Sequence, residues 1–175
     1  MRKKKCVICQ NEFLPERNFQ KWCSIDHAID YANQLKQKNL RKQYREAKEH
    51  AKTRQDWIKE AQTAFNAYIR ARDAVLPCIS CGRFHQGQYH AGHYRTTAAA
   101  PELRFNELNV WKQCAPCNNH KHGNITEYRI NLVKRIGLDK VEWLEGQHEP
   151  KKYTIEELKQ IKDTYKRKLR EIQND

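Results

Sequence analysis

The chain has 175 residues, which suits one compact domain or a small domain with extensions. Only 38% of the residues are apolar and 31% are charged, so a large apolar core cannot be the only source of stability, and small domains often gain stability from bound metal. The formal net charge is +13, and the basic residues are distributed along the sequence. This charge indicates a polyanionic partner, usually nucleic acid. A basic protein without a specific partner is the alternative.

The sequence contains no run that approaches the roughly 18 apolar residues of a membrane span. The basic start MRKKK is not followed by the apolar segment of a signal peptide. We therefore expect no membrane partner and a cytoplasmic location, in a bacterial host cell if a phage encodes the protein. In that compartment the seven cysteines should be thiols or metal ligands rather than disulfides.

Residues 1–27 are expected to form a small zinc module. Cys6 and Cys9 make a CxxC pair, and Cys23 and His27 follow with CxxxH spacing. Zinc prefers four tetrahedral sulfur or nitrogen ligands, and a CxxC turn directs two thiolates to one ion. These four residues predict a structural zinc site.

Residues 28–75 contain neither proline nor glycine and are rich in good helix formers. The pattern predicts one long helix, or two helices with a break near Thr53, where Thr53 and Asp56 resemble a capping box. The middle of this segment, KQKNLRKQYREAKEHAK, is strongly basic. It is either a solvated helix face or a helix that lies along a phosphate backbone, and the net charge favours the second.

Residues 76–137 hold the second cysteine group, Cys78, Cys81, Cys114 and Cys117, with the spacing CxxC-x32-CxxC. Other pairings are possible, but this partition uses every cysteine, and the pattern is a strong zinc signature. A redox dithiol is the alternative for any single CxxC. The sequence therefore predicts two structural Zn²⁺ ions per chain.

Residues 138–175 are expected to form a helical tail. Thr154 and Glu157 make a capping box for a last helix that runs to about Ile172 and carries the basic run KRKLR.

The stretch between the CxxC pairs contains features that a zinc ribbon does not need. HAGHY spans His90–Tyr94, Asn109 precedes the second pair, and Asn118 directly follows Cys117. This order resembles the zinc-supported HNH endonucleases, which have a ββα-metal core. The wider chain resembles the NinG/Rap recombination proteins of lambdoid phages, through KKKCVIC, WCSIDHAIDYA, FNAYIRARD, CISCGR, AGHY, RFNELNV and QCAPCNNHKHGN.

The resemblance implies a role for each matching residue. His93 corresponds to the histidine that activates water, and Asn109 to the asparagine that holds the loop orienting that histidine. Asn118 corresponds to a ligand of one catalytic divalent ion, Mg²⁺ or Mn²⁺. Many relatives carry another ligand immediately before the general base, but this chain has Gly92 there. His90 is the nearest substitute.

Four more residues complete the expected site. His120 and His122 compete with His90 as metal ligands, and solvent-exposed or phosphate-contacting histidines are the alternative for both. Arg95 and Lys121 are cations that could bind phosphate and stabilise the charge of the transition state.

Together these features predict an α+β, mostly helical fold. It should contain a small zinc-supported ββα-metal core, a long N-terminal helix, an N-terminal zinc module and C-terminal helices. The resemblance implies a metal-dependent, structure-selective DNA endonuclease that acts on branched recombination intermediates of the Holliday junction or D-loop type.

Two other functions stay open at this point. A non-catalytic, zinc-dependent DNA-binding module is favoured by Gly92 and by the absence of Asp and Glu between Cys81 and Pro101. An RNA-directed protein would make the same phosphate contacts. The long helix could also form a homodimer, although no sustained heptad repeat requires one.

Overall fold

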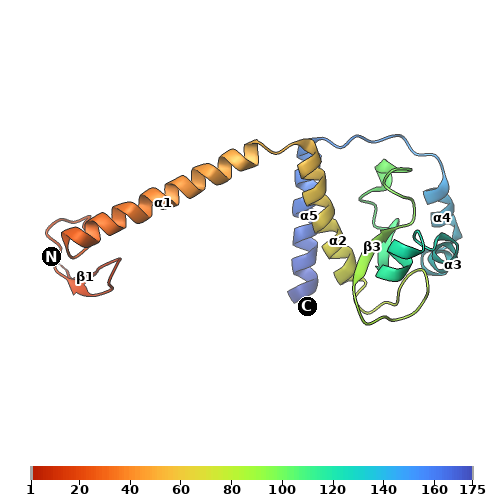
Figure 1. The fold of residues 1–175 in the computed structure, drawn as a ribbon, viewed down its shortest axis with the longest axis horizontal. Helices are drawn as coiled ribbons and strands as arrows, with labels where there is room; N and C mark the ends of the chain where they lie inside the picture. The colour runs from red at the N-terminus through yellow and green to blue at the C-terminus, as the bar shows by residue number, and fades with distance from the viewer. Residues whose placement is uncertain (1, 175) are drawn as a thin grey trace. The chain divides into compact units, whose positions relative to one another are not determined.

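The computed structural model describes residues 2–174, which form a mostly helical α+β chain (Figure 1). The chain divides into two compact units, Met1–Lys52 and Thr53–Asp175. We call them the N-terminal and the C-terminal unit and describe each by itself. None of the described helices has the length and apolar character needed to cross a membrane.

The N-terminal unit consists of a small hairpin and one helix. Strand β1 (Lys4–Lys5) pairs antiparallel with β2 (Glu12–Phe13), and helix α1 spans Ile25–His50. Ser24 caps α1, because its side-chain oxygen accepts a hydrogen bond from the backbone N–H of His27 at 3.3 Å. No residue of α1 is buried, so this unit does not supply an apolar core around its own helix.

The helix break expected near Thr53 is confirmed. Thr53 and Asp56 form the reciprocal hydrogen bonds of a capping box, and α2 (Arg54–Arg72) starts there. Because α2 buries Trp57, Phe65 and Ile69, it packs with the C-terminal unit. The segment expected at 28–75 is therefore divided between the two units.

The C-terminal unit contains a second hairpin. Strand β3 (Tyr89–His93) pairs antiparallel with β4 (Val110–Cys114), and the 3-10 turn η1 (Pro101–Leu103) lies in the connection between them. A single π-helical turn, η2 (Pro116–His120), follows β4. Three helices complete the unit: α3 (Ile125–Ile136), α4 (Leu138–Glu145) and α5 (Ile155–Asn174).

The β3–β4 hairpin has a separate apolar cluster on each face, as expected when side chains alternate along a strand. Ala91 and Val110 pack with α2 and α5, which lie side by side (Figure 1). Tyr94 and Trp111 pack with α3 and α4. Helices α4 and α5 thus belong to the same unit as the hairpin.

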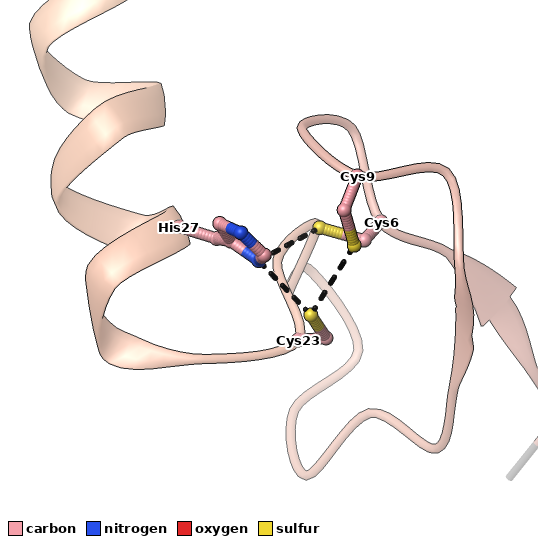
Figure 2. Close-up of side chains that lie close together, drawn as sticks. All are labelled: Cys6, Cys9, Cys23 and His27. Carbon is pink, nitrogen blue, oxygen red and sulfur yellow. Dashed lines mark hydrogen bonds between the residues drawn. The ribbon is translucent and has the colours of Figure 1, made fainter.

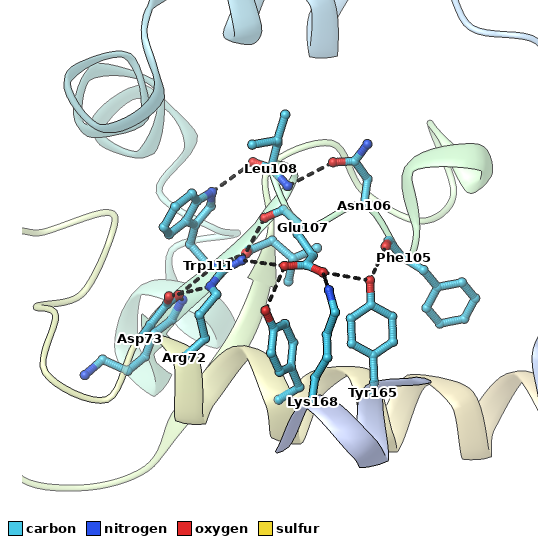
Figure 3. Close-up of polar contacts among 12 residues, drawn as sticks. Arg72, Asp73, Phe105, Asn106, Glu107, Leu108, Trp111, Tyr165 and Lys168 are labelled. Carbon is cyan, nitrogen blue, oxygen red and sulfur yellow. Dashed lines mark hydrogen bonds and ion pairs between the residues drawn. The ribbon is translucent and has the colours of Figure 1, made fainter. Parts of the chain in front are cut away.

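Arg72, at the end of α2, connects this helix to the hairpin (Figure 3). Its guanidinium donates to the Asp73 carboxylate at 2.7 Å, to the Glu107 carbonyl at 3.1 Å and to the Val110 carbonyl at 2.9 Å. It also stacks 4.2 Å from the centre of the Trp111 ring. The buried Asp73 in turn accepts a hydrogen bond from the backbone N–H of Lys112.

The Glu107 carboxylate connects the loop between the strands to both helices. It accepts hydrogen bonds from Tyr68 of α2 and from Tyr165 and Lys168 of α5 (Figure 3). Burial raises the pKa of Glu107, but the hydrogen bonds from Lys168 and Tyr68 outweigh this effect. Its pKa therefore lies below the ordinary 4.5.

Glu107→Gln should reduce the free energy of unfolding at pH 7 by about 1 to 3 kcal/mol, because three donors lose a charged acceptor. A lowered folded-state pKa stabilises the protein above the unfolded-state value and is lost as the pH falls through the folded-state value. The difference between variant and parent should therefore shrink below pH 4.5. Urea unfolding as a function of pH measures it, with the exposed Glu142→Gln as control. A constant difference across this range would contradict the prediction.

Candidate metal centres and candidate active site

The first cysteine group converges in the N-terminal unit (Figure 2). Sγ of Cys9 and Sγ of Cys23 are 3.7 Å apart, and Nδ1 of His27 lies 3.7 Å from Sγ of Cys6 and 3.1 Å from Sγ of Cys23. Ligand atoms of one tetrahedral zinc ion lie roughly 3 to 4 Å apart. The four side chains could therefore hold zinc, and His27 contributes from the first turn of α1.

The second group, Cys78, Cys81, Cys114 and Cys117, also converges, with all four sulfur atoms within 4.8 Å of one another. Cys78 and Cys81 lie in a turn that Gly82 closes with a φ of 66°. Cys114 ends β4 and Cys117 lies in η2. Both cysteine groups expected from the sequence are thus brought together as sites that could hold two zinc ions.

His85 is a neighbour of the second cluster that the sequence reasoning missed. Its Nε2 lies 3.2 Å from Sγ of Cys81, and its backbone N–H donates to the Tyr89 hydroxyl at 2.7 Å. Burial raises the pKa of the Cys81 thiol, but the contact with His85 and a backbone hydrogen bond lower it to about 6 overall. The spacing of four residues between Cys81 and His85, equal to that between Cys23 and His27, was the available signal.

Within residues 2–174, these two clusters are the only groups of three or more His, Cys, Asp or Glu residues whose ligand atoms lie within 4.8 Å of one another. His90, His120 and His122 therefore do not form a third cluster with one another or with acidic residues. The expectation of a catalytic divalent ion receives no support from such a cluster.

His93 is the last residue of β3, and its ring is partly buried. Nε2 lies 2.9 Å from the carbonyl oxygen of Arg104, which can only accept a hydrogen bond. Nε2 therefore carries the proton, and Nδ1 has a free lone pair in the neutral ring. Burial lowers the pKa of His93, more than the Arg104 carbonyl raises it, so the ring is neutral at pH 7.

The buried Asn109 closes the loop that follows His93. Its Oδ1 accepts from the backbone N–H of Arg95 at 2.8 Å, and its Nδ2 donates to the carbonyls of Arg95 and Leu103 at 3.0 and 3.2 Å. Its own carbonyl accepts from the backbone N–H of Tyr94 at 2.8 Å. One asparagine thus joins both ends of the loop that contains Arg104.

Gly92 occupies a position where no side chain fits. A Cβ atom there would lie 2.1 Å from Oε1 of Gln113, and Gln113 is buried and held by Ser80 and by the carbonyl of Gly123. The Gly92 carbonyl also accepts from the Tyr128 hydroxyl at 2.9 Å. The position before His93 therefore cannot carry a metal ligand in this packing.

The remaining candidate ligands lie in two places. His90 is on the same face of β3 as Gly92, and its Nε2 is buried without a hydrogen-bond partner among residues 2–174. Asn118 lies in η2 and donates to Oδ1 of Asn119 at 2.8 Å. His120 and His122 are exposed.

The two expected phosphate-binding cations differ in their surroundings. Nη1 of Arg95 donates to the carbonyls of Leu144 and Glu145 at 3.2 and 2.9 Å, so this side chain satisfies the C-terminal end of α4. Lys121 is exposed beyond η2.

The chain matches a known protein family over its whole length. A family model described as "NinG: Bacteriophage Lambda NinG protein" matches residues 1–175. The chain belongs to the NinG family. "Protein ninG" of Escherichia phage 933W is 42% identical over 190 residues, which cover 98% of this chain and 94% of that protein. "Protein ninG" of Escherichia phage lambda is 55% identical over 123 residues, which cover 70% of this chain and 60% of that protein. No solved structure matches the chain.

Each cysteine cluster should hold one zinc ion, so the purified NinG-family protein should contain close to two zinc ions per chain. Cys23→Ser and Cys81→Ser should each leave one, because the ligands of the two clusters do not overlap. Elemental analysis of the protein measures both. A parent protein with one zinc ion or none would contradict the assignment.

Proposed function

We propose that this protein is a metal-dependent, structure-selective DNA endonuclease acting on branched recombination intermediates of the Holliday junction or D-loop type. The observation that carries the proposal is the state of His93: a neutral ring whose Nε2 proton is held by the Arg104 carbonyl, leaving Nδ1 free. The order of hairpin, η2 and α3 around it resembles a ββα-metal core. The substrate implies action in the cytoplasm of the bacterial host.

His93 is suited to the first chemical step. A phosphodiester is anionic and repels hydroxide, so a nuclease must produce its nucleophile from water at neutral pH. Nδ1 of His93 can take that proton, and the Arg104 carbonyl stabilises the imidazolium that results. Asn109 acts as a positioning residue, because it fixes the loop that presents this carbonyl.

Asn118 and His90 are the proposed ligands of the catalytic ion. The buried, unpartnered Nε2 of His90 supports this choice, since a ligated metal would satisfy it. When bound, a divalent ion would neutralise charge on the scissile phosphate and on the leaving 3′ oxygen. Imidazole suits Mn²⁺ better than Mg²⁺, so Mn²⁺ should support activity well. Lys121 is free of the helix-capping contacts that hold Arg95 and is the better phosphate ligand.

The zinc ions of the two clusters would be structural. Four protein ligands leave no open coordination position for water or substrate.

A second candidate function is a non-catalytic DNA-binding recombination accessory protein. The packing of Gln113 against Gly92 favours it, because a common ligand position is blocked. Cleavage assays with Mg²⁺ and Mn²⁺ on duplex, single-stranded, three-way and four-way DNA separate the two functions. A pure binding protein cuts none of them, whereas the proposed nuclease cuts the branched substrates preferentially.

His93→Ala should reduce cleavage of branched DNA at least about 100-fold, because the general base is lost. Binding of the same DNA should change little, since His93 carries no charge at pH 7. Single-turnover cleavage and fluorescence anisotropy measure the two quantities. His148→Ala, which removes a histidine packed edge to face against Trp143, is the control and should cut normally. Undiminished cleavage by His93→Ala would exclude His93 as the base.

Helix α1 should contribute to DNA affinity through its exposed cations. Replacing Lys38, Arg41 and Arg45 by Ala should weaken binding and lower the slope of log Kd against log[salt] by about 2 to 3, since each phosphate contact contributes about 0.9. Titrations of duplex DNA at several salt concentrations measure the slope. The matched control replaces the exposed Lys134, Lys140 and Lys152. An unchanged slope would leave α1 as a solvated helix face.

A further inference from the structure

A groove lies along α2, and one of its lining residues, Arg104, contacts the candidate base through its backbone carbonyl. The groove is lined by Gln55, Ile58, Lys59, Gln62, Thr63 and Asn66 of α2 and by Arg104 of the loop between the strands. These residues include two cations and three side-chain amides but no carboxylate. The groove therefore carries positive charge together with neutral hydrogen-bonding groups.

The side chain of Arg104 is a half-buried cation whose hydrogen-bond partner is a neutral amide. Its Nη1 donates to Oε1 of Gln62 at 3.2 Å, and it makes no ion pair within residues 2–174. Burial, and then the nearby charge of Arg54, lower the pKa of the guanidinium, while Tyr153 raises it. A desolvated charge without a counter-ion is unfavourable, so such an arrangement suits a site that an anion completes.

The same residue touches the candidate base. The carbonyl oxygen of Arg104 accepts the hydrogen bond from Nε2 of His93, while its side chain reaches α2 at Gln62. The Phe105 carbonyl, one residue on, is held by the Tyr165 hydroxyl at 3.2 Å, which fixes the backbone here. The guanidinium that would hold an anion and the carbonyl that orients His93 therefore belong to the same residue.

We propose that this groove binds the phosphodiester backbone of the nucleic-acid strand that is cut, with Arg104 and Lys59 contacting its phosphates. The amides of Gln55, Gln62 and Asn66 can donate to and accept from sugar and base atoms. This mixture fits a nucleic acid better than an acidic peptide, and the net charge of +13 agrees. The identity of the bound strand as the one that is cut rests on the proposed nuclease function, whereas binding of the strand does not.

Gln62→Glu tests the groove without removing a side chain. The new carboxylate would stand 3.2 Å from the guanidinium and pair with Arg104, and Asn66 can turn its amide to keep a hydrogen bond to residue 62. The melting temperature should stay the same or rise, while the affinity for a short single-stranded oligonucleotide and for four-way DNA should fall about tenfold. The exposed Gln147→Glu adds the same charge elsewhere and is the control.

Arg104→Gln gives an independent second test, because it keeps the backbone carbonyl that orients His93. Binding should again weaken about tenfold, and the salt slope should fall by about 0.7 to 0.9. The exposed Lys140→Gln is the matched control. Binding is measured by anisotropy in the His93→Ala background without added divalent ion, so that cleavage does not interfere.

The outcomes separate this proposal from the nuclease proposal. Weakened binding by both Gln62→Glu and Arg104→Gln, but by neither control, supports the groove even if the parent protein cuts no DNA with any divalent ion. Affinities within twofold of the controls overturn it, even if the parent cuts branched DNA. Displacement of the oligonucleotide by polyglutamate as readily as by unlabelled oligonucleotide also overturns it, because the groove would then be selective for charge alone.

Discussion

Four cysteines join the turn after α2 to the far end of the β3–β4 hairpin. A two-stranded hairpin is marginally stable alone, so its geometry depends on what holds its ends. At one end the cluster of Cys78, Cys81, Cys114 and Cys117 could be closed by zinc, and Ile79 adds a backbone hydrogen bond to Lys112. At the other end Asn109 closes the loop. The candidate base, His93, stands at this second end.

The loop between β3 and β4 connects the candidate base, His93, to helices α2 and α5. Its Glu107 carboxylate accepts hydrogen bonds from α2 and α5, and its Glu107 carbonyl accepts one from Arg72. The carbonyl of Arg104 contacts His93, and the side chain of Arg104 contacts α2. These polar contacts add to the packing of the buried Leu103 and Phe105 of the same loop. Such contacts are directional, so they orient the loop as well as stabilise it. A base that depends on a backbone carbonyl requires that orientation.

Much of the fold could be predicted because its signals are local. The capping boxes at Thr53 and Thr154 marked helix starts that the structure confirms, and ligand spacing predicted both cysteine clusters. The domain boundaries were less predictable. Residues 54–72 have the same helix-forming composition as α1, but their buried Trp57 and Phe65 assign them to the C-terminal unit. Such partners lie far away in the sequence, so composition alone does not reveal them.

The sequence by itself determined the two sets of zinc-type ligands and the family, because each depends on residue type and short spacing. Only the tertiary structure decided which nitrogen of His93 is free, since the Arg104 carbonyl lies eleven residues away. It also decided why residue 92 is glycine, because Gln113 of the partner strand fills the space beside it. Hydrogen-bond direction and excluded volume depend on atoms brought together by folding, and no local pattern encodes them.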